Sequence, residues 1–117
     1  MSLVAVGNTV TLAPNSGSTA NVANVSTRTT TFHVTNASAT VYAYVGVFST
    51  YATAAAMDHP SVGSDAGGII LTPNESMTIT GNFGTSANIS TVYVSAITAT
   101  GTTTVFFTPV AAGSSAN

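Results

Sequence analysis

The chain has 117 residues, of which 44% are hydrophobic and only 3% charged, with a formal net charge of -2 and no cysteine. One arginine and no lysine cannot neutralise a phosphate backbone or an anionic lipid surface, so composition argues against nucleic-acid and membrane binding. The hydrophobic content favours folding over disorder, and we expect a single β-sandwich domain over residues 1–117, with a short flexible tail at 111–117.

Runs of β-favouring residues, separated by Gly, Pro, Asn and Ser clusters, recur from end to end of the chain. They predict eight or nine strands, at Leu3–Val6, Thr9–Ala13, Ala20–Val25, Thr29–Thr35, Thr40–Phe48, Gly68–Thr72, Ser76–Thr80, Thr91–Ile97 and Thr102–Thr108. Short strands at this spacing are typical of an all-β protein. We therefore expect an antiparallel β-sandwich of about eight strands, either jelly-roll or immunoglobulin-like.

The strands differ in how many apolar faces they carry. Both alternating faces are apolar in 41–48, which predicts that each face of this strand meets protein, in the core or at an interface. The runs 91–97 and Val105–Phe107 also carry apolar residues on both sides, so the C-terminal third offers more apolar surface than one core needs. The run at 76–80 alternates cleanly instead, so Met77 and Ile79 should point inward while the hydroxyl side chains face water.

The connections can also be interpreted. Pro73 followed by Asn74 predicts a type I turn at 72–76, and 100–102 has the composition of a hairpin turn between the last two strands. The stretch from Ser49 to Gly67 is long for a loop in a compact domain, which indicates a functional segment, with a short helix at 51–57.

Few side chains could carry out chemistry. A metal site would have to use Asp58, His59 and Asp65, helped by His33 or Glu75, but neither the oxygen spacing of a hard-cation site nor a zinc motif is present. Turn and capping roles are favoured for the two aspartates, a solvated turn for Glu75 and an outward position for His33. No Ser lies in a Gly-x-Ser-x-Gly elbow. We expect no catalytic residue, no metal and no cofactor.

Abundant hydroxyl residues, 14 Ser and 22 Thr, raise two further alternatives. Chance accounts for four glycosylation sequons, which begin at Asn24, Asn36, Asn74 and Asn88. Ice binding would need a flat, regular threonine array, which the irregular spacing of the threonines does not predict.

Aromatic residues raise one more alternative, carbohydrate binding. A cluster of rings could stack on sugars, although a core or a subunit interface explains such a cluster more often. Its members are Tyr42, Tyr44, Phe48 and Tyr51.

The chain resembles the small β-sandwich virion proteins of tailed bacteriophages, in particular capsid decoration (cement) proteins. The resemblance lies in a strand just after Met1, in Val34-Thr35-Asn36 before 41–47, in the turn 71–76 leading into Met77-Thr78-Ile79, and in 92–97 continuing to Thr108-Pro109. It implies a protein on the outer capsid surface, often a trimer or dimer, that bridges major capsid subunits. A near-zero net charge also favours self-association.

These observations lead to one functional hypothesis. We expect a non-enzymatic structural protein on the capsid exterior, made in the host cytoplasm without a signal peptide, that binds the major capsid protein as a homo-oligomer. Its partner contacts are expected in the 49–67 loop, at Tyr51, Met57 and His59, and on an end strand. A head-fibre or tail module and a carbohydrate-binding sandwich are the alternatives.

Overall fold

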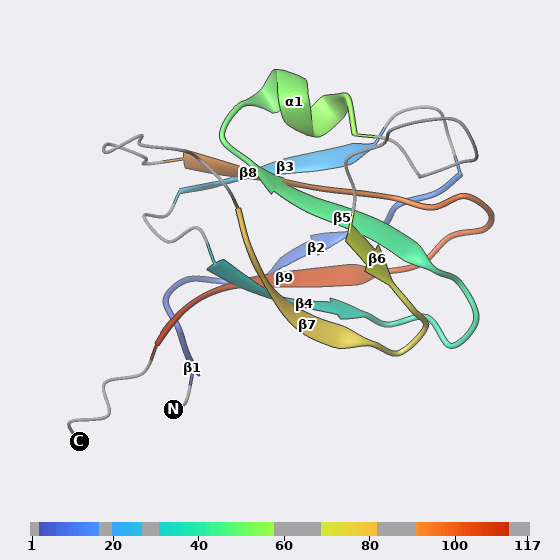
Figure 1. Ribbon diagram of the computed structural model, residues 1–117, viewed down its shortest axis with the longest axis horizontal. Coiled ribbons are helices and arrows are strands. Elements are labelled where there is room, and N and C mark those ends of the chain that lie inside the picture. The colour runs from blue at the N-terminus through green and yellow to red at the C-terminus, as the bar shows by residue number, and fades with distance from the viewer. Residues whose placement is uncertain (1–2, 17–19, 27–30, 58–68, 82–90, 113–117) are drawn as a thin grey trace.

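The computed structural model describes residues 3–16, 20–26, 31–57, 69–81 and 91–112 (Figure 1). In chain order the elements are β1 (Leu3–Ala5), β2 (Val10–Leu12), β3 (Asn21–Ser26), β4 (Thr31–Asn36), β5 (Ala43–Phe48), α1 (Tyr51–Ala55), β6 (Ile69–Leu71), β7 (Ser76–Thr80), β8 (Thr91–Ile97) and β9 (Val105–Ala112). Every predicted strand is present, and β7 and β8 have the predicted bounds. Strand β9 includes the first two residues of the predicted tail, whose remainder, 113–117, lies outside the described residues.

The strands form two antiparallel sheets that pack face to face. One sheet has the order β1-β9-β4-β7, with β2 also paired to β9, and the other has the order β3-β8-β5-β6. Pairing of β2 with β9, β3 with β8, β4 with β7 and β5 with β6 makes the chain one long hairpin. The β4–β9 and β5–β8 pairs roll that hairpin into two sheets. This is the jelly-roll topology, which decides between the two expected sandwich types.

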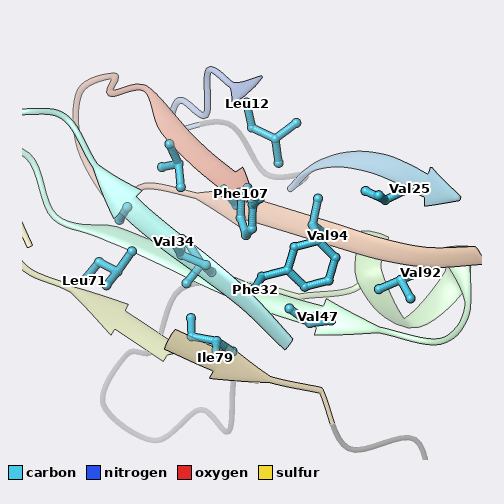
Figure 2. Packing of buried hydrophobic residues seen from close by; sticks show 14 residues of the cluster. Leu12, Val25, Phe32, Val34, Val47, Leu71, Ile79, Val92, Val94 and Phe107 are labelled. Atoms are coloured by element: carbon cyan, nitrogen blue, oxygen red, sulfur yellow. The ribbon is translucent and has the colours of Figure 1, made fainter. Parts of the chain in front are cut away.

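The core lies between the sheets and is built from alternate residues of the strands (Figure 2). Phe32 of β4 and Phe107 of β9 are fully buried there, opposite valines of β5 and β8. Side chains in a strand alternate between its two faces, so each strand contributes every second residue. Strand β7 confirms the predicted pattern: Ile79 is buried, Met77 packs against the core, and the hydroxyl side chains face outward.

The connection between β6 and β7 is a tight turn, but of a different type from the one predicted. The Glu75 amide donates to the Thr72 carbonyl at 3.1 Å, and Asn74 has a φ of 62°. Because the ring of Pro73 fixes a negative φ at the second position, a positive φ at the third identifies a type II turn. Asparagine tolerates that conformation better than most residues.

The predicted hairpin at 100–102 is wrong. Strands β8 and β9, which flank it, belong to different sheets, so the segment between them crosses from one sheet to the other. The chain changes direction within this segment, where Gly101 has a φ of 77° and the Thr98 hydroxyl donates to the Gly101 carbonyl at 2.6 Å. Turn composition predicts where the chain bends, but it carries no information on which sheet the next strand joins.

A fully buried amide at Asn36 ties together the connections at one end of the sandwich. Its side-chain nitrogen lies 2.8, 3.3 and 3.2 Å from the carbonyl oxygens of Val41, Leu71 and Thr72. Its side-chain oxygen accepts from the Thr103 hydroxyl at 2.7 Å and from the Ser38 amide at 3.2 Å. One side chain therefore fixes the ends of β4 and β6 and the β8–β9 crossover. It also makes this sequon inaccessible to glycosylation in the folded protein.

Candidate functional site

Helix α1 begins directly after β5 because its sequence supplies a cap. Thr50 has an extended conformation, and its hydroxyl accepts from the Thr53 amide at 3.3 Å, which satisfies one of the unpaired amides at the helix start. The helix is alanine-rich and only five residues long, so packing must stabilise it. The helix itself confirms the short helix predicted in this region.

Helix α1 covers the outer face of the sheet at β3, β5 and β8 (Figure 1). Met57, just past the helix, is only 4% exposed and packs with Ile97 and Phe48. The Ser95 hydroxyl donates to the Met57 sulfur at 3.3 Å. A glycine at position 46 makes room for this layer, because a Cβ there would lie 2.5 Å from the Phe48 ring and 3.0 Å from the Met57 sulfur. The second apolar face predicted for β5 and β8 is therefore confirmed and lies under α1.

Tyr51 stands at the start of α1 and is the most exposed large side chain of this region. It is 62% exposed, and its ring packs edge-on against Tyr93 of β8 at a centroid distance of 6.2 Å and an interplanar angle of 79°. Such an edge-to-face contact leaves most of the ring in solvent. The tyrosine is thus an exposed aromatic projection.

The same sheet exposes apolar side chains at its β6 edge. Ile70 is 46% exposed and lies directly opposite Tyr44 of β5, on the outer face, while Ile69 is 43% exposed at the rim of the core face. Tyr42 is 51% exposed and lies two residues before Tyr44 on the same outer face, which makes it a diagonal neighbour of Ile70. Among the described strands none pairs with the far edge of β6. We call Tyr42, Ile69 and Ile70 the apolar edge.

A surface hollow of about 410 Å³ lies among the connections at the Asn36 end of the sandwich. Its lining residues carry only methyl, hydroxyl and backbone groups and are Ala13, Ala37, Ser38, Thr102, Thr103 and Thr104. Such a lining supplies no acid, no base and no nucleophile beyond a hydroxyl. In the described ranges, no three His, Asp, Glu or Cys side chains gather closely enough to hold a metal ion. Over the same residues, no helix is long and apolar enough to cross a membrane.

The structure describes two of the three predicted contact residues. Tyr51 is exposed, as a contact residue must be, whereas Met57 is buried beneath α1 and can only support a contact surface from below. His59 lies outside the described residues, as do the metal candidates Asp58 and Asp65. A partner role for the three residues stays a prediction.

The remaining predicted residues are placed as follows. His33 is exposed on β4, as predicted, while Glu75 is half-buried and accepts from the Thr72 amide at 2.8 Å and from the Thr72 hydroxyl at 3.0 Å. The proposed sugar platform does not form one surface. Tyr44 and Phe48 pack on the buried layer under α1, and the exposed Tyr42 and Tyr51 lie beyond opposite ends of β5, a strand about 20 Å long.

The apolar edge was missed by the sequence analysis, although Ile69-Ile70-Leu71 is a run of three aliphatic residues in so short a strand. That run indicates a buried strand as readily as an exposed edge, so only the sheet order distinguishes the two. Comparison with known proteins gave no match to any family model, curated protein or solved structure. The surfaces of the chain are therefore the features that indicate its function.

Proposed function

We propose that the chain is a non-enzymatic structural protein of a phage virion, a capsid decoration protein that docks on the outer surface of the shell through its apolar edge and stabilises the shell. The observation that carries this proposal is the pair Ile69 and Ile70 on the edge strand β6, next to Tyr42, which directly precedes the neighbouring strand β5, with no charged side chain among the three. Exposed edge strands are normally protected by lysine, proline or a covering element. An edge formed by isoleucines favours a permanent partner.

The charge distribution supports docking by shape and apolar contact. Among the described residues Glu75 is the only side chain with a formal charge, and Thr72 engages its carboxylate through an amide and a hydroxyl. Electrostatic steering over this part of the surface is therefore weak, and docking through the apolar edge buries no formal charge. Contacts of this kind are individually weak, but a symmetric shell repeats them many times, and a homo-oligomer that bridges several shell subunits gains avidity.

The jelly-roll fold supports the proposed virion role by analogy only. Jelly rolls occur in viral capsid proteins and in lectins, and one such fold hosts many functions, so the surface of the chain is the stronger indication of its role. The head-fibre or tail role uses the same neutral surface and differs only in its place on the particle. Immunogold labelling of particles separates the two, because a decoration protein labels the whole shell and a fibre or tail protein labels one point on it.

Add-back to particles that lack this chain provides the test. The purified protein should co-sediment with such particles in a fixed ratio to the major shell subunit and raise the temperature at which a dye reaches the packaged genome. An Ile70→Lys variant places a charge in the apolar edge and should bind at least tenfold more weakly. Thr78→Lys, on the opposite sheet, should bind as the wild type does. Failure of the wild type to co-sediment would overturn the proposal. Normal binding by Ile70→Lys would show that the apolar edge is not the surface that docks on the shell.

A further inference from the structure

The outer face of the five-stranded sheet gathers hydroxyl side chains that are scattered in the sequence. The register places Thr35 of β4 opposite Ser76 of β7 and Phe106 of β9, and places His33 opposite Thr78 and Thr108. Thr11 of β2 lies opposite Phe106 in turn. We call this surface the hydroxyl face; its residues are all exposed or half-buried and are Thr9, Thr11, Thr31, His33, Thr35, Ser76, Thr78, Thr80, Phe106 and Thr108.

Several of these hydroxyls hold one another in place across the strands. Thr9 and Thr108 are 2.7 Å apart between their hydroxyl oxygens, and the hydroxyl oxygens of Thr35 and Ser76 are 2.9 Å apart. A hydroxyl has one donor and two acceptor lone pairs, so each pair uses one O–H group and leaves the other O–H and three lone pairs for a ligand. The fixed geometry lowers the entropy that a ligand must overcome in ordering these side chains.

Two rings lie within the hydroxyl face. Phe106 is 37% exposed, and its partner on β4 is Thr35. His33 lies two residues before Thr35 on the same face and is therefore a diagonal neighbour of Phe106. Diagonal neighbours in an antiparallel pair have Cβ atoms within about 7–8 Å, close enough for one ligand to touch both rings. The face therefore combines an exposed phenyl ring and an imidazole with hydroxyl donors and acceptors around them.

We propose that the hydroxyl face binds a neutral polysaccharide chain, with a sugar ring over Phe106 and neighbouring sugar hydroxyls on Thr35, Thr108 and Ser76. None of the ten described residues of the hydroxyl face is a carboxylate, lysine or arginine, which favours an uncharged ligand. It must also offer donors, acceptors and C–H surface together, and sugars have all three. A flat crystal lattice fits less well, because a sheet twists by about 20–25° per strand and the four strands β2-β9-β4-β7 turn through roughly 60–75°.

This site differs from the tyrosine platform suggested by the sequence, and it lies on the opposite sheet. It is also independent of the proposed shell docking, since the apolar edge belongs to the β3-β8-β5-β6 sheet. One molecule could hold a shell with one face and a glycan with the other.

Retention on neutral polysaccharides tests the proposal. The full chain is incubated with swollen, non-crystalline cellulose and chitin, and run through native gels containing mannan or dextran. We expect binding to at least one of these, weakened at least tenfold by Phe106→Ala and by Thr78→Lys. Tyr42→Ala, which removes an exposed ring from the other sheet, should bind as the wild type does. Thermal unfolding of each variant verifies that it is folded, and the surface position of Thr78 makes its variant informative even where Phe106→Ala is unstable.

Two results would overturn the proposal. The first is no retention on any of the four polysaccharides; faceted growth of ice crystals in the presence of the chain would then show that the hydroxyl face binds a water lattice. The second is retention that survives both substitutions; its loss in Tyr42→Ala would then place the site on the tyrosines instead. If the chain binds polysaccharide but does not dock on the shell, the result contradicts the proposed function and supports the present inference.

Discussion

Replacing Asn36 with alanine should destabilise the fold more than its size suggests. The amide nitrogen has two hydrogens for three nearby carbonyls, so at most two full-strength bonds form there, and the oxygen accepts two more, from Thr103 and Ser38. At about 1 kcal/mol net for each of four bonds, the free energy of unfolding should fall by about 4 kcal/mol. That is a large part of the roughly 5–15 kcal/mol that stabilises a domain of this size.

Urea unfolding followed by tyrosine fluorescence measures the effect. With an m-value of about 2 kcal/mol/M, the midpoint should drop by about 2 M. Asn24→Ala is the matched control, because Asn24 is an exposed strand residue and its loss should change stability by less than about 0.5 kcal/mol. If the free energy of unfolding of Asn36→Ala were within about 0.5 kcal/mol of that of the wild type, the hydrogen bonds of the Asn36 amide would not stabilise the connections at this end of the sandwich. Since Asn36 bonds the end of β6, the same variant should also weaken docking through the apolar edge.

Four further sets of substitutions test separate parts of the structure. Gly46→Ala should lower the free energy of unfolding by about 1–2 kcal/mol, because the added Cβ meets the Phe48 ring. Adding Phe48→Leu to this variant should recover part of the lost stability. Additive effects of the two substitutions in a double-mutant cycle would contradict the contact. Asn74→Gly should leave the urea midpoint unchanged or raise it, while Asn74→Val should lower stability by about 1–2 kcal/mol, and equal midpoints would argue against the type II turn. Phe107→Ala should cost about 3–5 kcal/mol in thermal or urea unfolding, and a loss below 1 kcal/mol would place that ring outside the core. Tyr51→Ala should cost less than about 1 kcal/mol, since the ring is mostly in solvent, and a larger loss would show that its contact with Tyr93 stabilises α1.

The strands could be predicted because their sequences alternate. Strand β7 is the clearest case: each inward residue is apolar and each outward residue carries a hydroxyl, so even its bounds follow from the pattern. Strand β5 has two apolar faces, and the pattern correctly indicated that both meet protein. It gave no sign that one of them meets α1, because the Gly46 gap and the Met57 layer depend on segments that are apart in the chain.

Long-range pairing accounts for the features that could not be predicted. Thr35, Ser76 and Phe106 become neighbours only through the β4–β7 and β4–β9 register, so the irregular spacing of the threonines concealed the hydroxyl face. The same spacing was the reason for rejecting a threonine array, and the pairing removes that reason. Asn36 and the crossover after β8 belong to this group too, since local sequence cannot show which sheet a strand joins.

Quantifying this chain in purified particles tests the central claim most directly. Particles are isolated from the host culture by density gradient, and the chain and the major shell subunit are counted by mass spectrometry against labelled peptide standards, alongside native mass spectrometry of the free protein. We predict an oligomer in solution and a constant ratio of the chain to the shell subunit in every particle fraction. A monomer that stays in the soluble fraction and is missing from the particles would contradict the account.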